Sequence, residues 1–168
     1  LLFRRTWLYA GHIDQLPTPG SYLIWPHGSA PIVLIHGDDG IVRAFYNTCR
    51  HRGAPLVRAG SGQAGARLVC GYHGWSYDRA GRLCGVTEQR DWRGLDRACH
   101  DLVAVQCARF GNWLFVCEDP HAAALEDFLE PVARYLRHLP LADLRLVSRR
   151  EFDVACNFKV LVDNFLEA

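Results

Sequence analysis

The stretch NTCRHRGAPLVRAGSGQAGARLVCGYHGWSYD, residues 47–78, organises the rest of this 168-residue chain. It contains two short ligand boxes, Cys49-x-His51 and Cys70-x-x-His73, separated by residues 52–69. Thiolate and imidazole both bind borderline-soft metal ions, so two loops that each carry one of each can hold a metal centre between them. A zinc finger more often groups Cys with Cys and His with His. The repeated Cys/His box favours a two-iron cluster, in which both thiolates bind one iron and both imidazoles bind the other.

Glycines accompany both boxes. Gly53, Gly71 and Gly74 permit tight turns in which backbone N–H groups can face metal-bound sulfurs. Two other interpretations of the four ligand residues stay open on this pattern: a zinc knuckle, and buried Cys and His side chains that bind no metal. We expect the remaining cysteines and histidines to be structural, namely Cys84, Cys99, Cys107, Cys117, Cys156, His12, His27, His36, His100, His121 and His138.

The residues around the boxes, Cys49-Arg50-His51-Arg52-Gly53 and Tyr72-His73-Gly74-Trp75, resemble the Rieske domain of ring-hydroxylating, non-haem iron oxygenase α-subunits. The resemblance implies a [2Fe–2S] cluster with Cys49, His51, Cys70 and His73 as its metal ligands. It also places Trp75 and Tyr77 at the cofactor site.

Two features near the boxes predict a low reduction potential. The resemblance implies that high-potential respiratory Rieske proteins carry an extra Cys in each loop, joined as a disulfide, where this chain has Ala54 and Tyr72. Those proteins also carry a Ser two residues after the second His, where this chain has Trp75. Tyr77 can still donate a hydrogen bond to a thiolate.

Composition excludes several classes of function. The net charge is +1 and no basic stripe alternates with aromatic residues, so nucleic-acid binding has no support. No apolar run approaches the ~20 residues needed to span a bilayer. The apolar stretch after Arg4-Arg5 is too short for an export signal. Seven scattered cysteines, an odd number, favour a reducing, cytoplasmic compartment over a disulfide framework. Because the chain contains no Met, we expect it to be part of a longer polypeptide.

Short strands are predicted where β-branched and aromatic residues lie between Pro or Gly turns. The expected strands cover Trp7–Tyr9, Ser21–Trp25, Pro31–His36, Ile41–Tyr46, Arg67–Val69, Asp101–Ala108 and Asn112–Cys117. Hairpin turns are expected at residues 37–40 and across Tyr77–Leu83. The Gly-rich spacer Ala59–Ala66 is expected to be a flexible surface connection without a chemical role.

The last third of the chain has a different pattern. Apolar residues recur at helical spacing between His121 and His138, and Pro131 predicts a kink or two shorter helices there. A strand is expected at Arg149–Cys156 and a helix at Asn157–Ala168. The predicted fold is mainly β: a Rieske-type antiparallel β-sandwich with two cluster-binding loops, then a helical linker and the start of an α+β catalytic domain. The expected boundaries are 1–120, 121–142 and 143–168.

Residues 157–167, NFKVLVDNFLE, resemble the oxygenase segment N-W-K-x-x-x-[DE]-N-[FY]-[LV]-E, with Phe158 in place of Trp. In that family the segment begins the catalytic domain and precedes two His that, with an Asp, bind a mononuclear Fe(II). No His follows His138, so those ligands are absent here. By resemblance Glu167 is an inter-subunit electron bridge between two imidazoles. The alternative is that Asp163 and Glu167 are solvated carboxylates on one helix face.

Three functions are compatible with these residues. The first is the electron-relay portion of a terminal oxygenase α-subunit, which takes electrons from a reductase or ferredoxin. Its mononuclear iron would activate O₂ to hydroxylate or demethylate a small organic substrate, which we expect to be aromatic, and the family implies a homotrimer or an α3β3 assembly. The alternatives are a stand-alone Rieske ferredoxin and a zinc-stabilised binding module. The substrate cannot be read from these residues.

Overall fold

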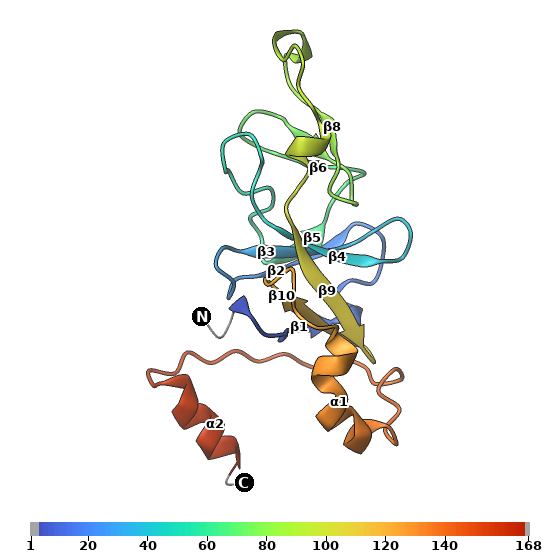
Figure 1. Ribbon diagram of the computed structural model, residues 1–168, viewed down its shortest axis with the longest axis vertical. Coiled ribbons are helices and arrows are strands. Elements are labelled where there is room, and N and C mark those ends of the chain that lie inside the picture. The colour runs from blue at the N-terminus through green and yellow to red at the C-terminus, as the bar shows by residue number, and fades with distance from the viewer. Residues whose placement is uncertain (1–3, 167–168) are drawn as a thin grey trace.

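The computed structural model of the chain describes residues 4–166. The larger sheet is antiparallel, with seven strands in the order β1-β10-β9-β4-β3-β2-β5, and the smaller sheet has the order β6-β7-β8. The strands are β1 (Leu8–His12), β2 (Ser21–Trp25), β3 (Ile32–His36), β4 (Val42–Tyr46), β5 (Ser61–Gln63), β6 (Leu68–Val69), β7 (Ser76–Tyr77), β8 (Leu83–Gly85), β9 (Ala104–Phe110) and β10 (Trp113–Cys117). Figure 1 shows the smaller sheet and its loops at one end of the molecule and the helices α1 (Leu125–Leu136) and α2 (Phe158–Leu166) at the other.

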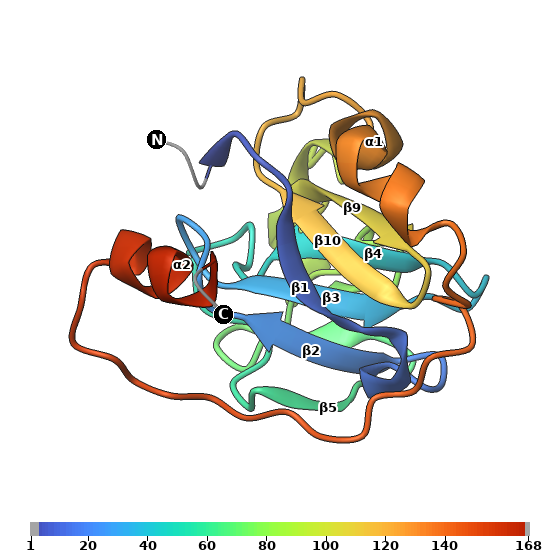
Figure 2. The same ribbon diagram turned by 90° about the horizontal axis from the view of Figure 1, so that it is seen from below.

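Strand β3 separates two hydrophobic cores. Because side chains alternate across a strand, Ile32 and Leu34 point into one core while Val33 and Ile35 point into the other. The first core also receives residues from β1, β2, β9 and β10, so the larger sheet curls to enclose it (Figure 2). The second core lies between the larger sheet and the smaller one, and it contains both box cysteines. The mainly antiparallel β prediction is therefore confirmed.

The spacer between the boxes is more ordered than its glycines suggested. Ser61–Gln63 forms strand β5, which pairs antiparallel with β2 at the edge of the larger sheet. The Gln63 side-chain amide donates to the Pro19 carbonyl at 2.7 Å and accepts from the Ser21 hydroxyl at 3.0 Å. The prediction of a flexible connection was wrong here, because edge pairing and a polar side chain fix the strand in place.

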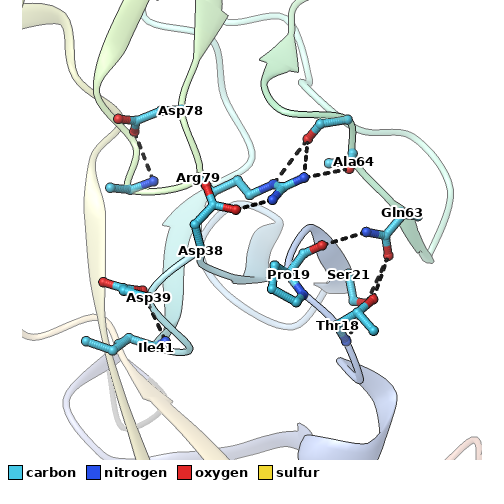
Figure 3. A network of polar contacts seen from close by, with 12 residues as sticks. Thr18, Pro19, Ser21, Asp38, Asp39, Ile41, Gln63, Ala64, Asp78 and Arg79 are labelled. Atoms are coloured by element: carbon cyan, nitrogen blue, oxygen red, sulfur yellow. Dashed lines mark hydrogen bonds and ion pairs between the residues drawn. The ribbon is translucent and has the colours of Figure 1, made fainter.

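A second anchor of the spacer is Arg79, which lies in the turn between β7 and β8. Its guanidinium pairs with the Asp38 carboxylate and donates to the Gly65 carbonyl at 2.9 Å. Figure 3 shows Arg79 reaching from the smaller sheet to both the β3–β4 turn and the end of the spacer. The spacer is thus held by polar contacts from two directions.

The segment after β10 differs in part from expectation. Helix α1 runs without a break from Leu125 to Leu136, with Pro131 inside it, so two shorter helices do not form. Helix α2 confirms the predicted C-terminal helix within the described residues. The strand expected at Arg149–Cys156 was wrong: this segment is extended, but no described strand pairs with it, and Phe152 is 78% exposed. Figure 2 shows the segment passing outside β5 on its way to α2.

Within residues 4–166, no helix has the length and apolar character that crossing a bilayer requires.

Candidate metal centre

The two boxes fold into loops with the same hydrogen-bonded frame. In the first loop the Cys49 N–H donates to the carbonyl of Ala54 at 2.8 Å, and the Gly53 N–H donates back to the Cys49 carbonyl at 2.9 Å. Gly53 adopts a φ of 74°, which a residue without a Cβ reaches at little cost. The loop therefore turns back on itself directly after the cysteine and leaves His51 at its tip.

The second loop repeats this frame with different residues. The Cys70 N–H donates to the carbonyl of Trp75 at 2.8 Å, and the Gly74 N–H donates to the Cys70 carbonyl at 2.9 Å. Gly74 has a φ of 70°, whereas Gly71 is not among the glycines with positive φ in the described chain. The prediction of tight glycine turns is confirmed for Gly53 and Gly74. In each box the glycine with positive φ is the fourth residue after the cysteine, although the histidine is the second residue in one box and the third in the other.

The loops bring the four predicted ligand residues together. Cys49 and Cys70 are 2% and 3% exposed, and the rings of His51 and His73 lie 4.7 Å apart at an angle of 68°. Within residues 4–166, the only buried side-chain nitrogen or oxygen atoms without a hydrogen-bond partner are Nδ1 of His51 and Nδ1 of His73. A buried polar atom left without a partner costs free energy, so native proteins rarely keep one without a reason. Two such atoms on neighbouring rings indicate a shared electrophilic ligand.

Tyr77 connects the two loops at the cysteine end. Its hydroxyl oxygen lies 3.3 Å from Sγ of Cys49 and accepts a hydrogen bond from the Arg50 backbone N–H at 3.0 Å. Because the oxygen already accepts from Arg50, its own proton is free to point at the sulfur. Burial, followed by the hydrogen bond with Cys49, raises the pKa of Tyr77 far above its usual value, which keeps the hydroxyl protonated.

The electrostatics of the ligand groups are set mainly by burial. Burial raises the pKa of the Cys49 thiol, while the Tyr77 hydroxyl and the His51 backbone N–H oppose that shift and the Cys70 thiol adds to it. Burial also lowers the pKa of His51, and the nearby His73 and Arg52 lower it further. The His51 ring is therefore held in the neutral form that binds metals, whereas the thiol needs a metal ion to become a thiolate.

Aromatic rings enclose the histidine end. Trp75 is 1% exposed and stacks on His51 with 4.8 Å between centroids and 8° between planes. Trp92 meets the His51 ring edge-on at 5.3 Å. Tyr72 lies against His73 at 3.8 Å. Trp75 was expected from the boxes, but Trp92 was missed, because no local motif marks a residue that reaches the site only through tertiary folding.

The donor set fits a [2Fe–2S] group. Two thiols and two unpaired imidazole nitrogens converge, and each pair contains one residue from each loop. In the described part of the chain, no three His, Cys, Asp or Glu side chains cluster in the way that a single ion would need. A structural zinc site needs four such ligands around one ion, whereas a cluster of two irons shares its ligands two and two.

The other cysteines named from the sequence differ in their burial. All seven cysteines are free, so no disulfide joins the two loops, which have Ala54 and Tyr72 at the positions of the respiratory cysteines. Cys117 is buried, and burial raises the pKa of Cys107 to about 12. Cys156, one of the cysteines that we expected to be structural, is exposed, because the segment around it does not pack on a sheet. Glu167 lies outside the described residues.

Comparison with known proteins identifies the class. Residues 6–107 match the family model of the Rieske [2Fe-2S] domain, so the chain belongs to this family. Its relatives are oxygenase subunits. The chain is 32% identical over 163 residues to the glycine betaine monooxygenase oxygenase subunit of Chromohalobacter salexigens, a match that covers 97% of this chain and 36% of that protein. It is 36% identical over 173 residues to the large oxygenase component of the 2,4-dinitrotoluene dioxygenase system of a Burkholderia species, covering 98% and 38%.

Solved structures agree with this assignment. The crystal structure of the apo form of CntA, a quaternary ammonium Rieske monooxygenase, superposes with a TM-score of 0.90 at 31% identity, covering 98% of this chain and 48% of that one. The likeness extends over α1 and α2, beyond the Rieske domain itself. It therefore supports an oxygenase subunit over a stand-alone Rieske ferredoxin. The chain spans less than half the length of these relatives.

Proposed function

We propose that this chain is the Rieske electron-relay portion of a terminal oxygenase α-subunit. The observation that carries the proposal is the pair of buried, unpartnered Nδ1 atoms of His51 and His73 beside two buried thiols. Cys49 and Cys70 would hold one iron and the two histidines the other, with Trp75 packed on His51 and Tyr77 donating to a sulfur. When bound, a [2Fe–2S] group supplies a one-electron store of tunable potential.

The surrounding residues leave the cysteine and histidine ends of the site differently exposed. The thiols are buried, whereas the imidazoles lie at the rim of a hollow of about 470 Å³ that His51, His73, Trp75, Thr87, Glu88 and Trp92 help to line. Electrons can then pass to or from the histidine side without a path through the core. No disulfide joins the loops, and Trp75 stands where the high-potential proteins carry a serine hydroxyl. Both features support a low reduction potential.

The proposed domain boundaries, second metal site and assembly rest on the similarity to oxygenase subunits. We assign residues 1–120 to the Rieske domain, 121–142 to a helical linker that contains α1, and 143–168 to the start of a catalytic domain. That domain would hold a mononuclear Fe(II) and activate O₂ for hydroxylation or demethylation of a small organic substrate. The electron donor would be a reductase or ferredoxin in the cytoplasm. Glu167 would bridge two subunits of a homotrimer or an α3β3 assembly.

Loading the chain with its cofactor tests the relay. Anaerobic reconstitution with iron and sulfide is expected to give visible absorbance that dithionite bleaches, and a reduced-state electron paramagnetic resonance (EPR) signal of a mixed-ligand cluster. His73→Ala should abolish both, while His121→Ala, an exposed histidine, should leave them unchanged. A protein that takes up zinc and no inorganic sulfide would rule the proposal out.

The oxygenase assignment has its own test. The coding sequence after Ala168 is expected to encode a His-x-x-x-x-His pair shortly downstream. With a reductase present, the full-length protein should then consume O₂ in the presence of quaternary ammonium or aromatic substrates. A reading frame that ends without such histidines would favour the ferredoxin alternative.

A further inference from the structure

We infer that the segment Thr87–Trp92, which lies outside both boxes, acts as a strap that holds the two histidine loops together and positions their rings. The inference rests on the proposed function, because it takes His51 and His73 to be ligands. The strap follows strand β8, and its middle residues form a short 3₁₀ helix, Gln89–Asp91.

One end of the strap is fixed to the second loop. The hydroxyl of Thr87 donates to the backbone carbonyl of His73 at 2.5 Å. The strap also packs directly against the turn of that loop, since a Cβ added to Gly74 would lie 2.7 Å from Oγ1 of Thr87. A side-chain contact to the His73 backbone restricts the direction in which the His73 ring can point.

The other end is fixed to the first loop. The Trp92 ring meets His51 edge-on at 5.3 Å and Trp75 at 5.2 Å, which places it against both partners of the stacked pair. The indole N–H of Trp92 donates to the backbone carbonyl of Thr87 at 3.1 Å. The two anchors are therefore joined to each other, and the strap closes a ring of contacts from His73 through Thr87 and Trp92 to His51.

The backbone between the anchors is strained. Glu88 has a φ of 54°, and no other non-glycine residue in the described chain has a positive φ. A left-handed conformation at a residue with a side chain is unfavourable, so it persists only where the surroundings enforce it. Thr87 and Trp92 hold Glu88 in this conformation from its two sides. Thr87, before it, is bonded to the His73 carbonyl, and Trp92, after it, is bonded back to the Thr87 carbonyl.

The strap contributes to holding the two loops together because no disulfide cross-links them. All the cysteines are free, so the loops are not cross-linked. Tyr77 ties them at the cysteine end through its contacts with Cys49 and Arg50. The strap is the corresponding tie at the histidine end. Without it, His51 would keep its stacking on Trp75, but the histidine ends of the two loops would lose the tie that Thr87 and Trp92 supply.

Variants of the two anchors in the cluster-loaded chain test the strap. Trp92→Ala is expected to speed cluster loss to an iron chelator, followed by visible absorbance, by about fivefold to tenfold, the effect of losing one or two ordinary contacts. Trp92→Phe should restore most of the difference, because a ring still meets His51. Thr87→Val should speed the loss by about threefold to fivefold, and Thr87→Ser should behave like the parent protein.

Spectroscopy separates positioning from mere stability. Trp92→Ala and Thr87→Val should each shift the reduced-state EPR signal and the midpoint potential, and their combination should cost less than the sum of the two, because both break one ring of contacts. Gln89→Ala, an exposed residue on the same strap, is the matched control and should change nothing. If the Trp92→Ala variant does not fold, the comparison of Thr87→Val with Thr87→Ser and with the parent still decides the question.

The two proposals fail differently. A parent chain that assembles no iron–sulfur cluster contradicts the proposed function. A parent chain that assembles one contradicts the strap alone if Thr87→Val and, where it folds, Trp92→Ala release the cluster at the parent rate with an unchanged EPR signal.

Discussion

The hydroxyl of Tyr77, in strand β7, lies 3.3 Å from the sulfur of Cys49 in the first ligand loop. The tyrosine oxygen accepts a hydrogen bond from the Arg50 N–H, which leaves its own proton free to point at the sulfur. A hydrogen bond to a thiolate is stronger when the sulfur carries more negative charge. This contact therefore favours the reduced form of a metal centre bound there.

Tyr77→Phe is expected to lower the midpoint potential by about 20–60 mV. This is the free energy of one ordinary hydrogen bond, converted to a potential for the transfer of one electron. A redox titration followed by visible absorbance measures the change. Tyr9→Phe alters a tyrosine that is 52% exposed on β1 and serves as the control. An unchanged or higher potential in Tyr77→Phe would show that the hydroxyl does not donate to the sulfur.

The two loop glycines should differ in their tolerance of alanine. Gly53 has open space around it, so Gly53→Ala should cost only the left-handed strain, about 1–2 kcal/mol of unfolding free energy. Gly74→Ala should cost more, because Thr87 can avoid the new methyl group only by giving up its bond to His73. Urea unfolding measures both, with Gly40→Ala, at a φ of 78° and with nothing nearby, as the reference for strain alone. Equal costs for Gly74→Ala and Gly40→Ala would contradict this.

Arg79→Gln should loosen the spacer between the boxes. The Arg79 side chain is 14% exposed and donates to the Gly65 carbonyl, so we expect a loss of about 1–2 kcal/mol and faster amide exchange in β5. Arg82→Gln removes a side chain that is 73% exposed and pairs only with Asp78, and should cost about 0.5 kcal/mol or less. If β5 exchanges at the same rate in both variants, Arg79 is not the anchor that its contacts indicate.

Glu118 should make stability depend on pH. Burial raises its pKa, but hydrogen bonds from the Ser29 hydroxyl, the Tyr46 hydroxyl at 2.8 Å and the Ser29 backbone N–H outweigh burial and hold the pKa below its usual value. A depressed carboxyl pKa stabilises the fold above the unfolded value of ~4.3, and this contribution disappears as the pH falls through the folded value. Urea unfolding of the parent and of Glu118→Gln should therefore differ more at pH 7 than at pH 3. A constant difference would contradict this linkage.

The sequence predicted the cluster loops well because their information is local. Each box carries its predicted ligands and its turn glycine within a few residues, so the loops Cys49 to Gly53 and Cys70 to Gly74 could be predicted without the fold. Trp92 and Thr87 could not, because they reach the histidines from a separate segment whose own sequence has no ligand pattern.

The two wrong expectations have a common physical cause. Strand formation depends on a partner as well as on residue type. Ser61–Gln63 has poor strand composition but lies beside β2, while Arg149–Cys156 has better composition and no described partner. Pairing that is decided by tertiary structure is not visible in the composition of one segment.

The alternation along β3 makes the smaller sheet dependent on the larger one. The strands of the smaller sheet are only two or three residues long, and their core depends on Val33 and Ile35 of the larger sheet. Such a sheet has too few pairs to fold by itself. The ligand loops therefore rest on a core that they share with β3, so a change at Val33 or Ile35 would disturb both loops without touching a ligand residue.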